Sequence, residues 1–493
     1  MSHESADCET TNKEPDFGSS GQPSLFAEHK KVQPRSVRGP HRQIKWAVLT
    51  VIMLAYYILP WLRWDRGPGI ADQAVLFDFD GRRFFMFNIE IWPQQIYYIT
   101  FILILSAVVL FLTTALFGRL WCGYACPQTL WTDLFMLVER WIEGDRNERI
   151  RRDREPMTLN TFWLKLGKHV IWLVIALLTG GWFIFYFYDA PTLVRDFTAG
   201  TVTTATIVMI LILSMMTYFL AGYLREHTCT FMCPWPRFQS AMQDEESLIV
   251  TYRAWRGEGR GPLRKSVSWE QRKAQGLGDC IDCRACQHVC PTGIDIRDGS
   301  QLQFIGCALC IDACDEVMTR IGRPKGLVAF DTLNAQNACA AGEKPRYRLL
   351  RPRTLLYMAL LLVVGVFMVT TYAERALVHV SLLRDRAPLY VRLAGGEIMN
   401  GFTFRISNLT RQAHQYTVTL EGIPGARMVS SGGDEAPVAS LHLAAAPDAV
   451  ATFRVTVRAP KDALAGTSTP IRVVVHSETA EINDSYDPSF MGP

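Results

Sequence analysis

The residues with the clearest chemistry are cysteines, and most of them are grouped. The chain has 13 cysteines, and 11 of them fall between Cys122 and Cys314. The tightest group is Cys280-Ile-Asp-Cys283-Arg-Ala-Cys286-Gln-His-Val-Cys290-Pro291. This C-x2-C-x2-C-x3-C-P run is typical of [4Fe-4S] ligation, in which three thiolates wrap one cluster and the fourth ligates a neighbouring cluster. Zinc is the alternative, but a zinc site needs only four ligands in pairs and has no use for this run.

A second copy of the pattern follows as Phe304-Ile-Gly-Cys307-Ala-Leu-Cys310-Ile-Asp-Ala-Cys314, with Phe304 in the place of the first cysteine. In the two-cluster arrangement, the first cluster takes Cys280, Cys283, Cys286 and Cys314. The second is left with Cys290, Cys307 and Cys310, so it is one thiolate short. A three-iron cluster, a fourth ligand from Cys339 or a nearby Asp, and a labile cluster are the open alternatives.

Two further cysteine pairs share a C-x3-C-P pattern, Cys122 to Pro127 and Cys229 to Pro234. Proline suits the first position of a helix, so Cys126 should precede a helix N-terminus, where the helix dipole favours thiolate. Soft thiolates suit Cu(I) or another soft metal, and they equally suit a reversible disulfide. Four inert, buried cysteines are the remaining alternative. We predict a copper site formed by Cys122, Cys126, Cys229 and Cys233.

These motifs alternate with five apolar runs that approach the roughly 20 residues of a membrane-spanning helix. The runs are residues 44–62, 95–117, 170–188, 201–223 and 354–372. The first run follows a long polar segment and lacks the cleavage site of a signal peptide, so we expect an uncleaved anchor. His169, just before the third run, is expected to be a packed or interfacial residue.

Basic residues predict the orientation of these spans. They precede the first run and fill the segment between the second and third runs, at Lys30, Lys31, Arg35, Arg38, Arg42, Lys45, Arg140, Arg146, Arg149, Arg151, Arg152 and Arg154. The positive-inside rule places both segments, and the insert before the fifth run, in the cytoplasm. Residues 63–94 carry four arginines and therefore fit a periplasmic position less well. The charges of the other loops outweigh this segment in setting the orientation. We therefore predict a bacterial inner-membrane protein with a periplasmic C-terminal domain.

The predicted fold is a multidomain membrane protein. We expect a disordered cytoplasmic tail (1–43), transmembrane helices with both C-x3-C-P motifs (44–251), a linker with a bacterial-type ferredoxin domain (252–353), a fifth span (354–373) and a C-terminal domain (374–493). Short alternating apolar and polar runs in the last segment, such as residues 401–407 and 451–457, predict an all-β immunoglobulin-like sandwich. A net charge of +4 gives no argument for nucleic acid.

Taken together, the motifs resemble the FixG-like family of cytochrome c oxidase accessory proteins, which are membrane-bound polyferredoxins. The resemblance covers almost the whole chain, including residues 74–78 with Arg83, Trp92-Pro-Gln94, both C-x3-C-P motifs and residues 292–297. It implies ferredoxin clusters that pass electrons to Cu(II), giving Cu(I) for assembly of a haem-copper (cbb-type) oxidase. Phe304 departs from the family, which usually has cysteine there, and this bears on the second cluster.

The function that we predict is electron transfer from a cytoplasmic donor, through the Cys280 cluster, to copper held by the C-x3-C-P cysteines. The expected partners are this donor, copper-delivery or oxidase-assembly proteins, and the membrane. A redox-sensing membrane protein and a quinol-linked electron conduit are the rival hypotheses. The sequence has no nicotinamide or flavin fingerprint, so another molecule must supply the electrons.

Overall fold

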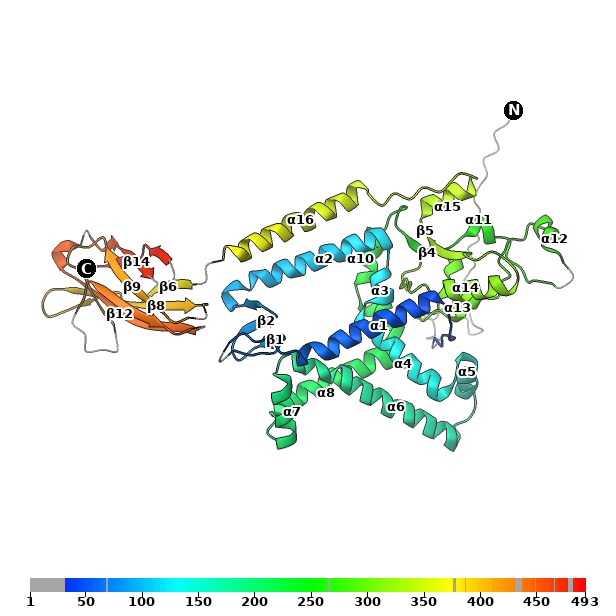
Figure 1. Cartoon of the computed structure of the whole chain (residues 1–493), viewed down its shortest axis with the longest axis horizontal. Helices are drawn as coiled ribbons and strands as arrows, with labels where there is room; N and C mark the ends of the chain where they lie inside the picture. Colours follow the sequence, from blue (N-terminus) through cyan, green and yellow to red (C-terminus); the bar gives the residue numbers. More distant parts are fainter. Residues whose placement is uncertain are drawn as a thin grey trace, which may run out of the picture. The chain divides into compact units, whose positions relative to one another are not determined.

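The computed structural model describes residues 32–493 except 68–69, 265–266, 376–377, 386, 411, 431–436, 448, 465 and 478–481 (Figure 1). The chain divides into two compact units. One contains the described residues up to Trp64 together with Asp72–Leu362, and the other contains Asp65–Ala71 and Val363–Pro493. The cysteine motifs all lie in the first unit.

In the described part, five helical segments are long and apolar enough to cross a membrane. Their helices are α1 (Pro40–Ile58), α2 (Tyr97–Phe117), α6 (Leu159–Thr179), α8 (Thr204–Tyr218) and α16 (Pro352–Ala373). Each matches one predicted run, although α6 begins well before residue 170. Thr158 caps this helix by accepting a hydrogen bond from the Thr161 amide at 3.2 Å. The early turns are too polar to be recognised in an apolar run.

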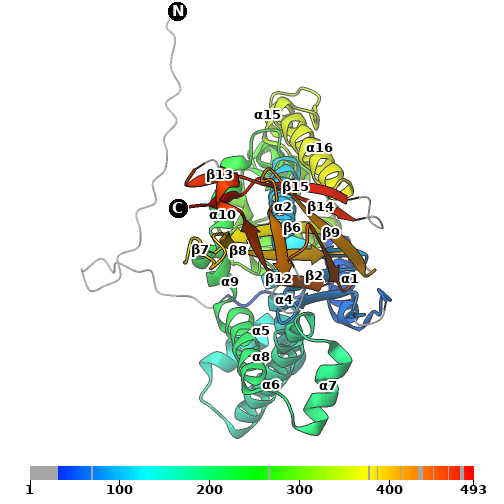
Figure 2. The same ribbon diagram turned by 90° about the vertical axis from the view of Figure 1, so that its left-hand side faces the viewer.

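Helices α6 and α8 lie side by side, as both views show (Figures 1 and 2), and α4 (Pro127–Glu143) packs against α6. Buried Phe135, Trp172 and Ala221 form the centre of this contact. The Trp172 indole donates a hydrogen bond to the Phe135 carbonyl at 3.2 Å. The shorter helices nearby are α3 (Leu120–Tyr124), α5 (Arg146–Arg154) and α7 (Ala190–Ala199).

The fourth span continues beyond the predicted residue 223 and changes its helical pitch. It passes through the π-helical segment η4 (Phe219–Leu224), the single turn α9 (Arg225–His227) and the π-helical segment η5 (Thr228–Met232). Helix α10 (Trp235–Met242) follows. Cys229 therefore lies within the helical segment. π-Helical turns often mark functional sites because they shift side chains out of the regular helical positions.

A small antiparallel sheet joins the first two spans. The expected hairpin is present as β1 (Val75–Asp78) and β2 (Arg83–Met86), and β3 (Ile89–Ile91) adds a third strand beside β2. The Asp78 carboxylate accepts a hydrogen bond from the Gly81 amide at 2.8 Å and so fixes the turn.

The ferredoxin domain is built on a two-stranded antiparallel sheet of β4 (Ile249–Tyr252) and β5 (Val328–Asp331). Its helices are α11 (Ala254–Gly257), α12 (Trp269–Ala274), α13 (Ala285–His288), α14 (Leu309–Arg320) and α15 (Leu333–Ala340). The hydrophobic core contains five buried cysteines, surrounded by Val250, Leu309, Met318 and other apolar side chains.

The segment before the first span differs from the expected disordered tail. Residues 1–31 lie outside the described part, but the backbone from residue 32 onward packs on the ferredoxin domain, where the Arg35 amide donates to the His288 carbonyl at 2.7 Å. Helix α1 starts at Pro40, and Asp312 of α14 accepts hydrogen bonds from the His41 and Arg42 amides. A carboxylate at a helix N-terminus satisfies free amides and the helix dipole. This cap comes from another domain, so local sequence does not reveal it.

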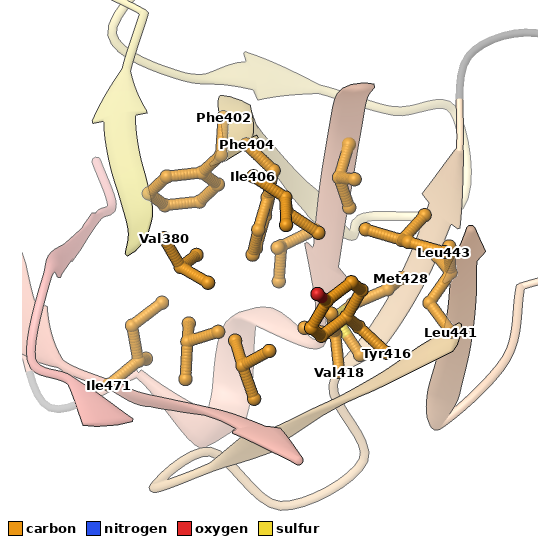
Figure 3. Close-up of a cluster of buried hydrophobic side chains, with 14 of the residues drawn as sticks. Val380, Phe402, Phe404, Ile406, Tyr416, Val418, Met428, Leu441, Leu443 and Ile471 are labelled. Atoms are coloured by element: carbon orange, nitrogen blue, oxygen red, sulfur yellow. The ribbon is translucent and has the colours of Figure 1, made fainter. Parts of the chain in front are cut away.

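The C-terminal unit contains the expected antiparallel sandwich. One sheet has the order β10-β12-β8-β6 with β7 beside β8, and the other has the order β11-β9-β14-β15. The strands are β6 (Val378–Arg384), β7 (Val391–Arg392), β8 (Ile398–Asn408), β9 (His414–Glu421), β10 (Arg427–Ser430), β11 (Ser440–Ala445), β12 (Ala449–Ala459), β13 (Ser468–Pro470), β14 (Arg472–Ser477), β15 (Ile482–Tyr486) and β16 (Ser489–Met491). Phe402, Phe404 and Tyr416 meet between the sheets (Figure 3).

Candidate iron-sulfur and thiol sites

We call Cys280, Cys283, Cys286 and Cys314 the ferredoxin quartet. All four line one small cavity between the β4-β5 sheet, the 280–286 loop and α14. Asp282 and Arg284 adopt left-handed backbone conformations, with φ of 53° and 52°, and so turn the loop around this cavity. Four thiols around one enclosed space fit the donor set of an iron-sulfur cluster.

Burial raises the pKa of the Cys286 and Cys314 thiols to about 12. Thiolates are the ligands, so a cluster must displace these protons when it binds.

The loop that carries Cys280 is held by an arginine from the segment expected to be a plain linker. The buried Arg272 side chain donates hydrogen bonds to four backbone carbonyls, including that of Cys280 at 2.8 Å and that of Gly261 at 2.8 Å. Arg272 therefore supports the ferredoxin quartet from outside the cysteine motif. This role could not be predicted from the sequence, because Arg272 precedes the motif and shares no spacing with it.

We call Cys290, Cys307 and Cys310 the ferredoxin trio. Burial and the neighbouring Cys307 and Cys290 thiols raise the pKa of Cys310 well above its ordinary value. Phe304 is buried in the ferredoxin core, so an apolar ring stands where a fourth thiol would be. The trio fits three-thiolate ligation. Of the proposed fourth ligands, Cys339 lies on α15 beside Tyr347, and no described contact brings it to the trio.

A buried ion pair lies next to the ferredoxin trio. Burial raises the pKa of Cys307, and the buried Lys45 ammonium opposes this effect. The Lys45 Nζ lies 3.6 Å from Asp133 Oδ2, and Arg42 also pairs with Asp133 at 2.8 Å. Burial opposes the ionisation of Asp133, but Lys45 and Arg42 outweigh it and lower the pKa of this carboxyl. Lys45 counted in the sequence only toward the orientation of the first span, although it lies within residues 44–62, where a charge suggests a function.

We call Cys122, Cys126, Cys229 and Cys233 the membrane-edge quartet. Cys122 lies in α3, Cys126 precedes α4 with Pro127 at its first position, and Cys229 lies in η5. The structure brings the four thiols into one neighbourhood, since Cys126, Cys229 and Cys233 all influence the ionisation of Cys122. Burial, followed by these neighbours, raises the pKa of Cys122 to about 12, so this residue is a thiol until a metal displaces its proton.

The spacing of the thiols restricts what they hold without rearrangement. In the described part of the chain, no three His, Cys, Asp or Glu side chains are close enough together to hold a single metal ion. The twelve cysteines that the structure describes form no disulfide. The Cys122 thiol instead donates to the buried Gln239 carbonyl oxygen at 3.4 Å.

The membrane-edge quartet and the ferredoxin trio are joined by a backbone contact. An added Cβ at Gly123, between Cys122 and Cys126, would lie 2.8 Å from the Gly306 carbonyl oxygen and 2.9 Å from the Cys307 Cα. Gly306 has a φ of +70°, and its own Cβ would meet the Arg119 carbonyl oxygen at 2.9 Å. Helix α3 and the loop before α14, which are far apart in sequence, therefore meet through two glycines.

Arg119 fastens this contact. Its buried guanidinium donates hydrogen bonds to the carbonyls of Leu302 and Phe304, both at 2.7 Å, and to that of Pro236 at 3.2 Å. One side chain thus ties the segment before Cys122 to the ferredoxin loop and to α10. Only its position close to Cys122 marked it in the sequence.

A second buried charge cluster supports the helix that carries Cys229. Glu139 of α4 is fully buried and pairs with Arg149 at 2.9 Å and with Arg225. Lys168 lies 4.0 Å from Glu139 and 2.8 Å from Glu143. Burial opposes the ionisation of Glu139, but Arg225, Arg149 and Lys168 outweigh it and lower its pKa. The four segments meet only in the folded chain, so no spacing along the sequence predicts this cluster.

Comparisons with known proteins match both cysteine regions and the C-terminal unit. A family model described as "4Fe-4S binding domain" matches residues 99–144, and one described as "4Fe-4S dicluster domain" matches residues 224–333. A third model, the "IG-like fold at C-terminal of FixG", matches residues 368–493.

Two relatives are similar over nearly the full chain. Protein RdxA of Cereibacter sphaeroides is 44% identical over 454 residues, which are 91% of this chain and 94% of RdxA. Nitrogen fixation protein FixG of Rhizobium meliloti is 39% identical over 495 residues, which cover 95% of this chain and 94% of FixG. Among solved structures, a FixG-related protein from Vibrio parahaemolyticus matches 24% of this chain and 96% of its own, at 19% identity and a TM-score of 0.21.

Proposed function

Because the chain belongs to the FixG-like family of membrane-bound iron-sulfur electron-transfer proteins, we propose that it reduces Cu(II) to Cu(I) at the membrane-edge quartet. The Cu(I) would serve the assembly of a haem-copper oxidase. The proposed orientation places the ferredoxin domain in the cytoplasm, where a donor delivers electrons, and the sandwich in the periplasm. Copper-delivery or oxidase-assembly proteins are the proposed partners.

The observation that carries this proposal is the glycine contact between Gly123 and Gly306. It places helix α3, which carries Cys122, directly against the loop of the ferredoxin trio, with no side chain between the two backbones. Each iron-sulfur cluster, when bound, supplies one-electron transfer, and reduction of Cu(II) consumes one electron. The ferredoxin quartet and trio are the proposed ligands of the two clusters, with Phe304 leaving the second at three thiolates.

The membrane-edge quartet has the properties of a site for an exchangeable soft ion. Cys233 is exposed, whereas Cys122, Cys126 and Cys229 are half-buried, so an incoming ion reaches Cys233 first. Thiolates prefer Cu(I) to hard cations, and this preference favours the reduced product. The helix N-terminus after Cys126 adds a favourable partial charge for a bound thiolate.

An anaerobic single-turnover experiment tests the proposal. The purified full chain, with its clusters, is reduced with dithionite, freed of excess reductant and mixed with Cu(II). We expect the iron-sulfur absorbance to return to its oxidised form while a Cu(I) chelator develops its colour in equal electron equivalents.

Matched cysteine variants make this test specific. Cys126→Ser and Cys233→Ser should lose Cu(I) formation and keep their iron content, whereas Cys339→Ser, a cysteine outside all three groups, should behave as the wild type. Reduced wild-type protein that leaves Cu(II) untouched would disprove the copper reductase proposal. Full Cu(I) formation by a variant that carries both Cys126→Ser and Cys233→Ser would show that the membrane-edge quartet takes no part in copper reduction.

A second candidate is that the membrane-edge quartet holds an iron-sulfur cluster of its own. It is favoured by the 4Fe-4S model that matches residues 99–144 and so includes Cys122 and Cys126. Cys229→Ser would then lower the iron and acid-labile sulfide content by about four atoms each per chain. Unchanged iron and sulfide in this variant would leave copper as the occupant.

A further inference from the structure

A cavity of about 560 Å³ lies between α6 and the π-helical end of the fourth span. This volume is in the range of small-molecule sites. Its lining combines aromatic, cationic and acidic side chains, among them Lys165, Lys168, His169, Trp172, Tyr223, Arg225 and Glu226. The electron-transfer function described above uses none of the aromatic residues.

The aromatic side chains form a stacked wall. The His169 and Tyr223 rings are nearly parallel, with centroids 5.9 Å apart and an interplanar angle of 9°. His169 Nδ1 lies 3.0 Å from the Tyr218 hydroxyl. Trp172 is perpendicular to His169, at 5.3 Å between centroids. Such a wall suits a flat ring, which it would contact by stacking and by edge-to-face packing.

One polar group at the wall is left without a protein partner. Arg225 is 6% exposed, and its Nη1 atom has no hydrogen-bond partner in the described structure. Its Nε donates to the Gly222 carbonyl at 2.7 Å, and its Nη2 pairs with Glu139. A buried donor without an acceptor is unfavourable, so a ligand oxygen at this position would satisfy it.

The surroundings of the cavity point to a ligand that arrives from the membrane. The outer face of α6 beside the cavity is apolar, with Phe162, Trp163 and Leu166 all more than 40% exposed. Glu139 and Glu143 neutralise Arg225 and Lys168, so the cavity is not the strongly cationic site that a phosphate headgroup needs. Ring stacking, a buried donor for an oxygen and an apolar approach together describe a quinone headgroup.

We propose that this cavity binds a quinol and is a second place where electrons reach the chain, besides the ferredoxin domain with its cytoplasmic donor, an inference that rests on the proposed copper reduction. Arg225 and Glu226 line both this cavity and a smaller one that Cys229 also lines, so the quinol would stand next to the membrane-edge quartet. The reaction balances as one quinol and two Cu(II) giving one quinone, two Cu(I) and two protons. The protons leave the two quinol hydroxyls for water.

Binding is tested directly with 2-heptyl-4-hydroxyquinoline N-oxide, a quinol analogue whose fluorescence is quenched when it binds. The full chain is placed in phosphatidylcholine nanodiscs and titrated. We expect saturable quenching by the wild type and at least ~10-fold weaker binding by His169→Ala and by Tyr223→Ala, which is about 1.4 kcal/mol. His442→Ala makes the same substitution on the sandwich and should bind as the wild type.

Three results would overturn the inference: no quenching by the wild type, equal quenching by all variants, or loss of quenching when phosphatidylglycerol replaces phosphatidylcholine. The last result would identify an anionic lipid as the occupant.

The two proposals fail separately. Wild-type protein that reduces Cu(II) after dithionite treatment but binds no analogue would refute the quinol site alone. Wild-type protein that binds the analogue and is reduced by decylubiquinol, but ignores Cu(II), would refute copper reduction alone.

Discussion

The ferredoxin quartet and the membrane-edge quartet are both sets of four cysteines, yet they are built in different ways. Three members of the ferredoxin quartet come from one short loop, Cys280 to Cys286, and the fourth comes from α14. The membrane-edge quartet takes two pairs from helical segments and helix ends about one hundred residues apart. The first depends on loop conformation, whereas the second depends on the packing of helices. This difference indicates which perturbations each should withstand.

The two quartets also differ in how deeply their cysteines are buried. Each has one exposed member, Cys283 or Cys233, but the other three are buried in the ferredoxin quartet and half-buried in the membrane-edge quartet. A more deeply buried site suits a cofactor that stays bound, and a more open site suits an ion that is exchanged. The following predictions test this contrast.

The largest effect is expected from Cys286→Ser. It removes a buried ligand from the ferredoxin quartet, so the first cluster should be lost, with about four fewer iron atoms per chain. Cu(II) reduction should then fall to the level of cluster-free protein. Iron analysis and the Cu(I) chelator assay measure both results, with Cys339→Ser as the control. Retained iron would mean that the ferredoxin quartet does not hold the cluster.

The next largest effect is expected from Glu139→Gln, which disrupts the buried charge cluster that supports the membrane-edge quartet. It leaves Arg225, Arg149 and Lys168 buried without their shared partner, which costs about 3–5 kcal/mol. Denaturant unfolding followed by tryptophan fluorescence measures the loss. The control Glu316→Gln removes an exposed pair with Arg320 and should cost at most about 1 kcal/mol. Equal losses of stability in the two variants would show that the buried charge cluster around Glu139 does not support the fold.

The same carboxyl predicts a pH dependence. The pKa of Glu139 is lower in the folded chain than in the unfolded chain, so its contribution to stability is full above the ordinary glutamate pKa of about 4.3. It is lost as the pH falls through the lower, folded value. The wild type should therefore lose more stability than Glu139→Gln between pH 5 and pH 3. Parallel pH profiles of the two proteins would contradict this assignment.

Gly306→Ala should separate α3 from the loop that carries Gly306 at the point where they meet. The new Cβ meets the Arg119 carbonyl oxygen, and an alanine at φ +70° is strained besides. Gly322→Ala is the matched control, since it has a φ of +69° and nothing within 4 Å of its Cβ. We expect Gly306→Ala to lose about 1–3 kcal/mol more than this control and to reduce Cu(II) more slowly. If the two variants have the same stability and reduce Cu(II) at the same rate, the contact at Gly306 contributes to neither property.

The smallest change is expected from Phe304→Cys, which adds the missing thiol to the ferredoxin trio. The iron content should rise by about one atom per chain, with the electron paramagnetic resonance spectrum changing from a three-iron to a four-iron signal. A labile second cluster in the wild type would instead give a gain of about four atoms. No change in iron or spectrum would mean that the trio holds no cluster.

The sequence was sufficient for the elements whose signal is local. The five apolar runs located the spans, because about 20 apolar residues make a spanning helix wherever they occur. Alternation of apolar and polar residues with a period of two predicted the sandwich, because this signal is also local. The π-helical end of the fourth span and the docking of residues 32–39 were missed, because both depend on contacts with other segments.

The candidate sites likewise depend partly on local sequence and partly on contacts between distant segments. Cysteine spacing by itself determined the ferredoxin pattern, since a C-x2-C-x2-C loop brings its three thiols together within one turn of chain. Only the tertiary structure decided that Cys122 and Cys229 share a neighbourhood, that Gly123 rests on Gly306, and that Cys339 stands apart from the trio. Close packing and buried ion pairs between distant segments set these distances, and no spacing along the chain encodes them.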